Sequence, residues 1–141
     1  MNSNTQRCIE LLKREGFTCV LSDGSSYIKS YERGVSPLVK LICENENVAG
    51  FSAADKIVGK AAALLYAKLK VCEVYADVLS EGAISVFEKY KISYYCNKLT
   101  TSISNRQNTG LCPMEQAVLE IDDPDAAFEA INSKLSELSD M

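Results

Sequence analysis

The stretch VCEVYADVLSEGAISVFEKYKISYYCNKL, residues 71–99, indicates the fold class. Residues 71–80 are rich in β-branched and aromatic side chains, which favour a strand. The next residues, 81–91, place Ile84, Phe87 and Tyr90 at helical spacing, and residues 92–99 have the composition of a strand again. A strand, a helix and a strand in this order predict a parallel pair joined by a crossover helix, and therefore an α/β protein.

The residues before this unit, 55–70, predict a helix that is buried on more than one side. Asp55 suits its N-cap or first turn and is followed by Lys56, while Lys68 and Lys70 suit the negative end of the helix dipole. Apolar residues cover most of its circumference, with small ones for close packing. We therefore expect Lys60 either to lie on the one wet face, or to hold its ammonium at the wall of a pocket. Residues 55–99 then follow the order helix, strand, helix, strand.

Turn and cap signals divide the rest of the chain. An amphipathic helix at the N-terminus ends at Gly16, and residues 17–21 and 26–31 predict a β-hairpin with its turn at Asp23-Gly24. Each of the three prolines is expected at the start of a helix, preceded by its cap. Ser36 and Asp123 are favoured caps for two of these helices, whereas the third has Cys112.

Composition limits the classes of protein that the chain can represent. Its 141 residues fit a single domain, residues 1–141. The composition, with 47% apolar and 24% charged residues, is ordinary for a globular protein. The net charge of −4 gives no basic surface for nucleic acid. Because the chain has neither a signal-peptide pattern nor a long apolar run, we expect a cytoplasmic protein with no membrane contact.

The sequence lacks the residues that usually form zinc sites and catalytic triads. The chain has six cysteines with no C-x-x-C pair, and no histidine, which argues against a tetrahedral zinc site. No phosphate-binding loop, dinucleotide fingerprint or nucleophile elbow is present. We expect no cofactor, and any acid–base catalysis would use Glu, Asp, Lys or Cys.

Cys112 and Glu115 are the most suggestive reactive pair. If Pro113 begins a helix, the Cys112 thiol occupies the N-cap, where unpaired N–H groups and the helix dipole favour the thiolate. Glu115 lies one turn later, where it opposes that effect or relays a proton, and Arg106 could supply positive charge. The alternative is that Cys112 is only a buried residue at a turn.

Four stretches carry a resemblance to a known family: ERGVSPL, ADKIVGKAAALL, YADVLSEGAI and NRQNTGLCPME. In order and spacing they resemble a family of uncharacterised prokaryotic proteins whose fold is similar to that of cytidine deaminases. The resemblance implies a three-layer mixed sheet, with an N-terminal antiparallel hairpin, then helix, strand, helix and strand, and with helices on both faces. Proteins of this fold often form oligomers, so a homo-oligomer is expected.

The zinc motifs of active deaminases are missing. Those enzymes open one core helix with H-x-E or C-x-E and the next with P-C-x-x-C, which supply three zinc ligands and a proton-shuttling glutamate. The corresponding stretches here read DKIVGKAAALL and LSEGAIS, and LCPMEQ comes too late in the chain to replace them. The sequence therefore excludes zinc-dependent deamination.

What the resemblance leaves is a pocket between two helix starts. One wall would be the start of the buried helix, with Asp55, Lys56, Gly59 and Lys60. The other would be Ser80, Glu81 and Gly82, which are otherwise an ordinary helix cap and first turn. The loop from Arg106 to Glu115 would close over it. One hypothesis is a site for a small anionic or nucleotide-like ligand, with Cys112 and Glu115 as reactive groups. The other is a non-catalytic binding or assembly module whose old pocket is filled by side chains.

Overall fold

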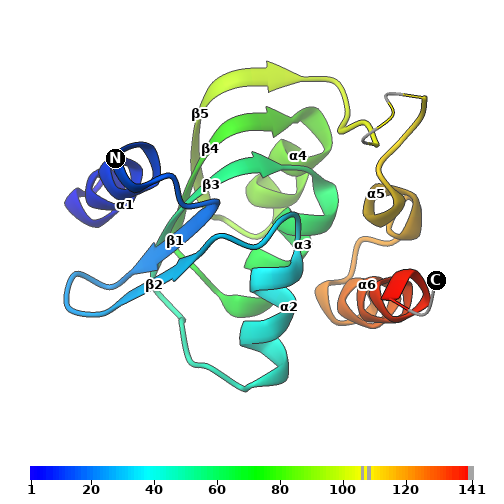
Figure 1. The fold of residues 1–141 in the computed structure, drawn as a ribbon, viewed down its shortest axis with the longest axis horizontal. Helices are drawn as coiled ribbons and strands as arrows, with labels where there is room; N and C mark the ends of the chain where they lie inside the picture. Colours follow the sequence, from blue (N-terminus) through cyan, green and yellow to red (C-terminus); the bar gives the residue numbers. More distant parts are fainter. Residues whose placement is uncertain (106, 108, 140–141) are drawn as a thin grey trace.

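The structure, a computed structural model, describes residues 1–105, 107 and 109–139, and its centre is one five-stranded sheet. The strand order is β2-β1-β3-β4-β5 (Figure 1). β1 runs antiparallel to both β2 and β3, whereas β3, β4 and β5 are parallel. The strands are β1 Cys19–Ser22, β2 Tyr27–Ser30, β3 Ser52–Val58, β4 Glu73–Ser80 and β5 Ser93–Thr100. The prediction of an α/β protein with a mixed sheet is therefore confirmed.

Helices cover both faces of the sheet, as Figure 1 shows. α1 packs on one face, where Cys8 and Leu12 meet Val20, Ala54 and Tyr75. α2, α3 and α4 cover the other face, and α5 and α6 pack against the outer side of α3. The helices are α1 Ser3–Glu15, α2 Ser36–Cys43, α3 Lys60–Leu69, α4 Glu81–Lys89, α5 Pro113–Ala117 and α6 Pro124–Ser139.

Several local predictions are confirmed. Gly16 ends α1 in the left-handed conformation, with φ of 74°. In the β1–β2 turn the Asp23 carboxylate accepts hydrogen bonds from the backbone N–H groups of Ser25 and Ser26. Asp123 caps α6 by accepting a bond from the N–H of Ala126. Residues 71–99 form β4, α4 and β5, as expected.

The helix predicted from residue 55 begins only at Lys60, and this prediction was wrong for residues 55–58, which belong to β3. Asp55 and Lys56 therefore lie inside a strand and not at a helix start. β3 is hydrogen-bonded on both edges, to β1 and β4, and its first four residues are buried, which removes the alternating pattern of a half-exposed strand. Its alanines and lysine favour a helix in isolation, its aspartate is also rare in strands, and the sheet overrides these preferences.

The predicted cap of α2 was also misplaced. Ser36 is the first helical residue, and Val35 is the N-cap, with no side-chain bond. The N–H groups of Leu38 and Val39 both bond to the carbonyl of Val35, so the first turn starts one residue earlier than expected.

α3 is the central helix of the layer that covers the second face. Seven of its ten residues are buried, because the sheet lies on one side and α6 on the other. The prediction of a helix buried on more than one side is confirmed for α3. In the part of the chain that the structure describes, no helix is both long enough and apolar enough to cross a membrane.

Candidate functional site

The N-terminal ends of α3 and α4 lie side by side, at the carboxyl ends of β3 and β4. Gly59 is the N-cap of α3 and Ser80 the N-cap of α4. The Ser80 hydroxyl is buried and accepts a hydrogen bond of 3.1 Å from the N–H of Ala83. A β-carbon built on Gly82 would lie 3.5 Å from Cβ of Lys60, so the first turns of the two helices are in contact. The structure thus places Lys60 beside the helix start that Ser80 caps.

A carboxylate from a distant part of the chain closes this site. Glu115 accepts a hydrogen bond of 2.9 Å from the N–H of Lys60 and one of 2.8 Å from the N–H of Ala61. These N–H groups have no partner within the helix and lie at the positive end of its dipole, so an anion is favoured there. The resemblance placed the loop from Arg106 to Glu115 over this pocket, but no spacing in the sequence indicates that the Glu115 carboxylate, 55 residues from Lys60, binds these two N–H groups.

Gly59 is required for this approach. A β-carbon at residue 59 would lie 2.3 Å from Oε1 of Glu115 and 2.8 Å from Cγ1 of Ile103, closer than real β-carbons come to other atoms. The space in front of α3 is therefore filled by Glu115 and Ile103, and only glycine leaves room for both.

Lys60 holds the same segment by its side chain. Its ammonium donates to the carbonyl of Leu119 at 3.2 Å and forms an ion pair with Asp122 at 3.3 Å. Its side chain is only 21% exposed, so the aliphatic part is largely covered. The backbone and the side chain of one residue thus fix residues 115–122 onto the start of α3.

Cys112 is the N-cap of α5 with Pro113 directly after it, as the sequence predicted. Its thiol makes no capping hydrogen bond; it is half-buried and packs against the core. Because the Glu115 carboxylate bonds to α3, no hydrogen bond joins it to Cys112 among the residues described. Arg106, the third member of this predicted group, lies outside the described residues.

Asp55 belongs to a separate, internal cluster. The Tyr66 hydroxyl donates to Oδ2 of Asp55 at 2.7 Å and lies 3.4 Å from Sγ of Cys19, which is opposite Asp55 in the β1–β3 pairing. Burial raises the pKa of Asp55 to about 7, although the Tyr66 hydroxyl lowers it, and burial also raises the pKa of Tyr66 and of Cys19 well above ordinary values. The one sequence signal for this cluster was the acidic Asp55 inside a run of small and apolar residues, which the structure shows to be buried.

The remaining predicted site residues do not take part in this closure. Lys56 and Glu81 are exposed, Lys56 on β3 and Glu81 in the first turn of α4, where an acidic residue suits the helix dipole. Within the described residues, no three His, Cys, Asp or Glu side chains converge in a way that could hold a metal ion. The site therefore consists of the N-termini of α3 and α4, and the carboxylate of Glu115 is bound to the first of them.

The fold and the site define an α/β protein with a five-stranded mixed sheet, in which a glutamate closes the N-terminus of a central helix. The chain belongs to the TM1506 family, a domain of unknown function (DUF1893), whose family model matches residues 7–135. The crystal structure of a DUF1893 family protein (TM1506) from Thermotoga maritima is similar, with 29% sequence identity and a TM-score of 0.83. The match covers 97% of this chain and 92% of that chain. A comparison with curated proteins finds no match.

Proposed function

We propose that the protein is a metal-independent binding protein on a cytidine-deaminase-like scaffold, and that its site for a small anionic ligand is the first turn of α3. One observation carries the proposal: two N–H groups of this turn already bind a carboxylate, that of Glu115. The order of the strands supports the scaffold, because an antiparallel hairpin is followed by parallel strands whose carboxyl ends lead into helix N-termini.

In this proposal Glu115 occupies the place of the ligand in the closed state. A ligand carboxylate or phosphate takes the N–H groups of Lys60 and Ala61 when the segment that carries Glu115 moves away. The Lys60 ammonium then pairs with the ligand in place of Asp122, and Ser80 and Glu81 flank the bound ligand. By analogy with the fold, the ligand is nucleotide-like, and Arg106 supplies a second positive charge.

The test is competition between Glu115 and added anions. Inorganic phosphate and cytidine monophosphate are titrated into the protein, and the amide resonances of Lys60 and Ala61 are followed by NMR. We expect Glu115→Ala to lower the Kd about ten-fold or more, because the internal competitor is gone, and Lys60→Gln to raise it. Glu129→Ala, the same charge change at an exposed position of α6, should leave Kd unchanged. If neither anion shifts these resonances in Glu115→Ala, the proposed site does not exist.

The second candidate is the non-catalytic assembly module, and the filled space in front of α3 favours it. In this candidate the closed state is permanent, and Glu115 acts only as a helix cap that a distant segment supplies. Sedimentation equilibrium of the wild-type protein tests the expected homo-oligomer, because a monomer at every concentration would remove this candidate.

Chemistry at Cys112 is the remaining element of the proposal. Because the thiol is half-buried and Glu115 is engaged elsewhere, a reactive Cys112 requires the segment to open. Alkylation by iodoacetamide, read by peptide mass spectrometry, should modify Cys112 faster in Glu115→Ala than in the wild type. The exposed Cys43, Cys72 and Cys96 report the rate of accessible thiols in the same sample. A rate for Cys112 in the variant no higher than that of these three excludes the catalytic version.

A further inference from the structure

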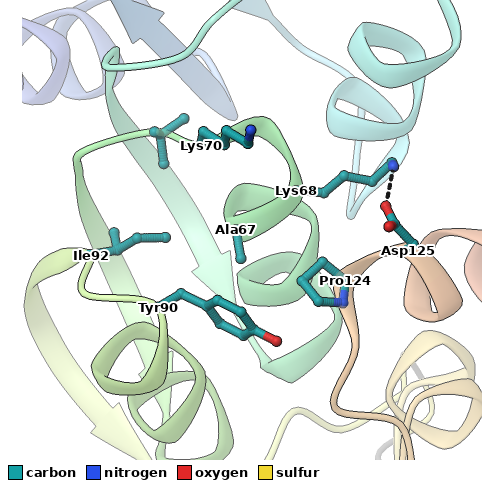
Figure 2. Close-up of a pocket in the computed structure, with 8 residues that line it drawn as sticks. Ala67, Lys68, Lys70, Tyr90, Ile92, Pro124 and Asp125 are labelled. Atoms are coloured by element: carbon teal, nitrogen blue, oxygen red, sulfur yellow. Dashed lines mark hydrogen bonds and ion pairs between the residues drawn. The ribbon is translucent and has the colours of Figure 1, made fainter.

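A groove lies at the other end of α3, away from Glu115. It has a volume of about 680 Å³ and is formed where α3 and α4 end and α6 begins (Figure 2). Ala67, Val71 and Ile92 supply aliphatic surface, and the Tyr90 ring and Pro124 add to it. Figure 2 shows Ala67 in the middle of these side chains, with Tyr90 and Ile92 on one side and Lys70 above. The volume is in the range of small-molecule sites.

Two lysines and one aspartate line this groove, although the protein as a whole carries a net charge of −4. Lys68 and Lys70 line it directly, and Lys89 and Lys91 flank Tyr90 in the sequence. The ammonium of Lys89 lies 5.3 Å from the centre of the Tyr90 ring. A lysine ammonium beside apolar surface attracts an anion to a place where a non-polar body can also be buried.

Two of these lysines differ in how far they are neutralised. The ammonium of Lys68 is paired with Asp125 and lies 5.7 Å from the centre of the Phe128 ring. Lys70 is exposed, and within the described residues no hydrogen bond or ion pair involves its ammonium. Its backbone has φ of 61°, a left-handed conformation in which glycine or asparagine is usual after a helix. Lys70 is thus the available cation of the groove.

We infer that this groove binds a small organic anion with an aromatic or other apolar body. The anionic group pairs with the Lys70 ammonium, and the body packs on Tyr90, Ile92 and Val71. Asp125 competes with the ligand for Lys68, so it weakens binding. The inference does not depend on the site at Glu115, which lies at the opposite end of a ten-residue helix, about 15 Å away by helix rise.

The experiment compares three probes that separate the charge from the apolar body: phenyl phosphate, inorganic phosphate and phenol. Each is titrated into the protein, and amide shifts are mapped by NMR. Phenyl phosphate should shift the resonances of Lys70, Val71 and Ile92, with a Kd at least five-fold lower than those of the other two probes. The amides of Lys60 and Ala61 serve as an internal check, because shifts there report the Glu115 site instead.

Three variants test the assignment of the charges. Lys70→Gln should raise the Kd for phenyl phosphate three-fold or more, whereas Lys98→Gln, the same charge change on exposed β5, should not. Asp125→Asn should lower the Kd about two-fold by releasing Lys68, an effect that a merely unfolded or loosened protein would not give. Equal Kd values for phenyl phosphate and inorganic phosphate would overturn the inference. So would equal effects of Lys70→Gln and Lys98→Gln in variants whose amide spectra show them to be folded.

Discussion

Asp55→Asn should abolish a pH dependence of stability that the buried carboxyl of Asp55 creates. Burial raises the pKa of this group from its ordinary value of 3.8 to about 7. Tyr66 from α3 opposes the rise through its hydrogen bond, and Asp77 on β4 adds to it. Asparagine keeps an oxygen for the Tyr66 hydroxyl but cannot titrate, so it removes the charge and keeps the shape.

The sign follows from which state holds the proton. Above about pH 4 the unfolded chain loses the proton from Asp55, whereas the folded protein keeps it until about pH 7. Folding is therefore linked to proton uptake, and the free energy of unfolding falls as pH rises through this range. Each pH unit is worth about 1.4 kcal/mol, so about 2 kcal/mol is lost between roughly pH 5.5 and 7, with a plateau above.

The assay is urea unfolding of both proteins, followed by circular dichroism from about pH 5.5 to 8, because an acidic protein nears zero net charge below this range. The free energy of Asp55→Asn minus that of the wild type should rise by about 2 kcal/mol and then level off. Tyr66→Phe removes the donor that lowers the pKa of Asp55, so its stability should keep falling to higher pH. A constant difference between the Asp55→Asn protein and the wild type would refute the reasoning.

Three further predictions concern the helix starts, and urea unfolding checks each. Glu115→Ala removes two hydrogen bonds from the start of α3 and should cost about 2 kcal/mol, with Glu115→Gln recovering less than half, since one of its atoms is a donor. Gly59→Ala should lower the free energy of unfolding by as much or more in the wild type, and by clearly less in the Glu115→Ala background, where the clashing carboxylate is absent. Strictly additive losses would argue against the close approach of Glu115 to residue 59. Ser80→Ala should cost about 1 kcal/mol, whereas Ser36→Ala, which removes no cap, should stay within about 0.5 kcal/mol; similar losses would contradict the cap assignment.

The sequence predicted the elements whose patterns are local. The unit from 71 to 99, the hairpin turn at Asp23 and the α6 cap at Asp123 all depend on residues close in the chain. β3 was missed because its pattern is set by neighbours that are distant in sequence. A strand buried between two others loses its alternation, and its alanines with Asp55 and Lys56 then look helical.

The site was predictable only in part for a similar reason. The proximity of Lys60 and Ser80 follows from two parallel strands leading into helices. The role of Glu115 does not, because a capping side chain from another element leaves no spacing signature at either end. The sequence placed Glu115 one turn after Cys112 as its reactive partner, but the structure directs its carboxylate to α3.

The hold of Glu115 on α3 also affects hydrogen exchange. The first amides of a helix normally exchange quickly with solvent, because no carbonyl within the helix accepts from them. The amides of Lys60 and Ala61 are bonded to Glu115 instead. Their exchange requires the segment from 115 to 122 to detach, so the rate at these two positions measures how often the closed protein opens.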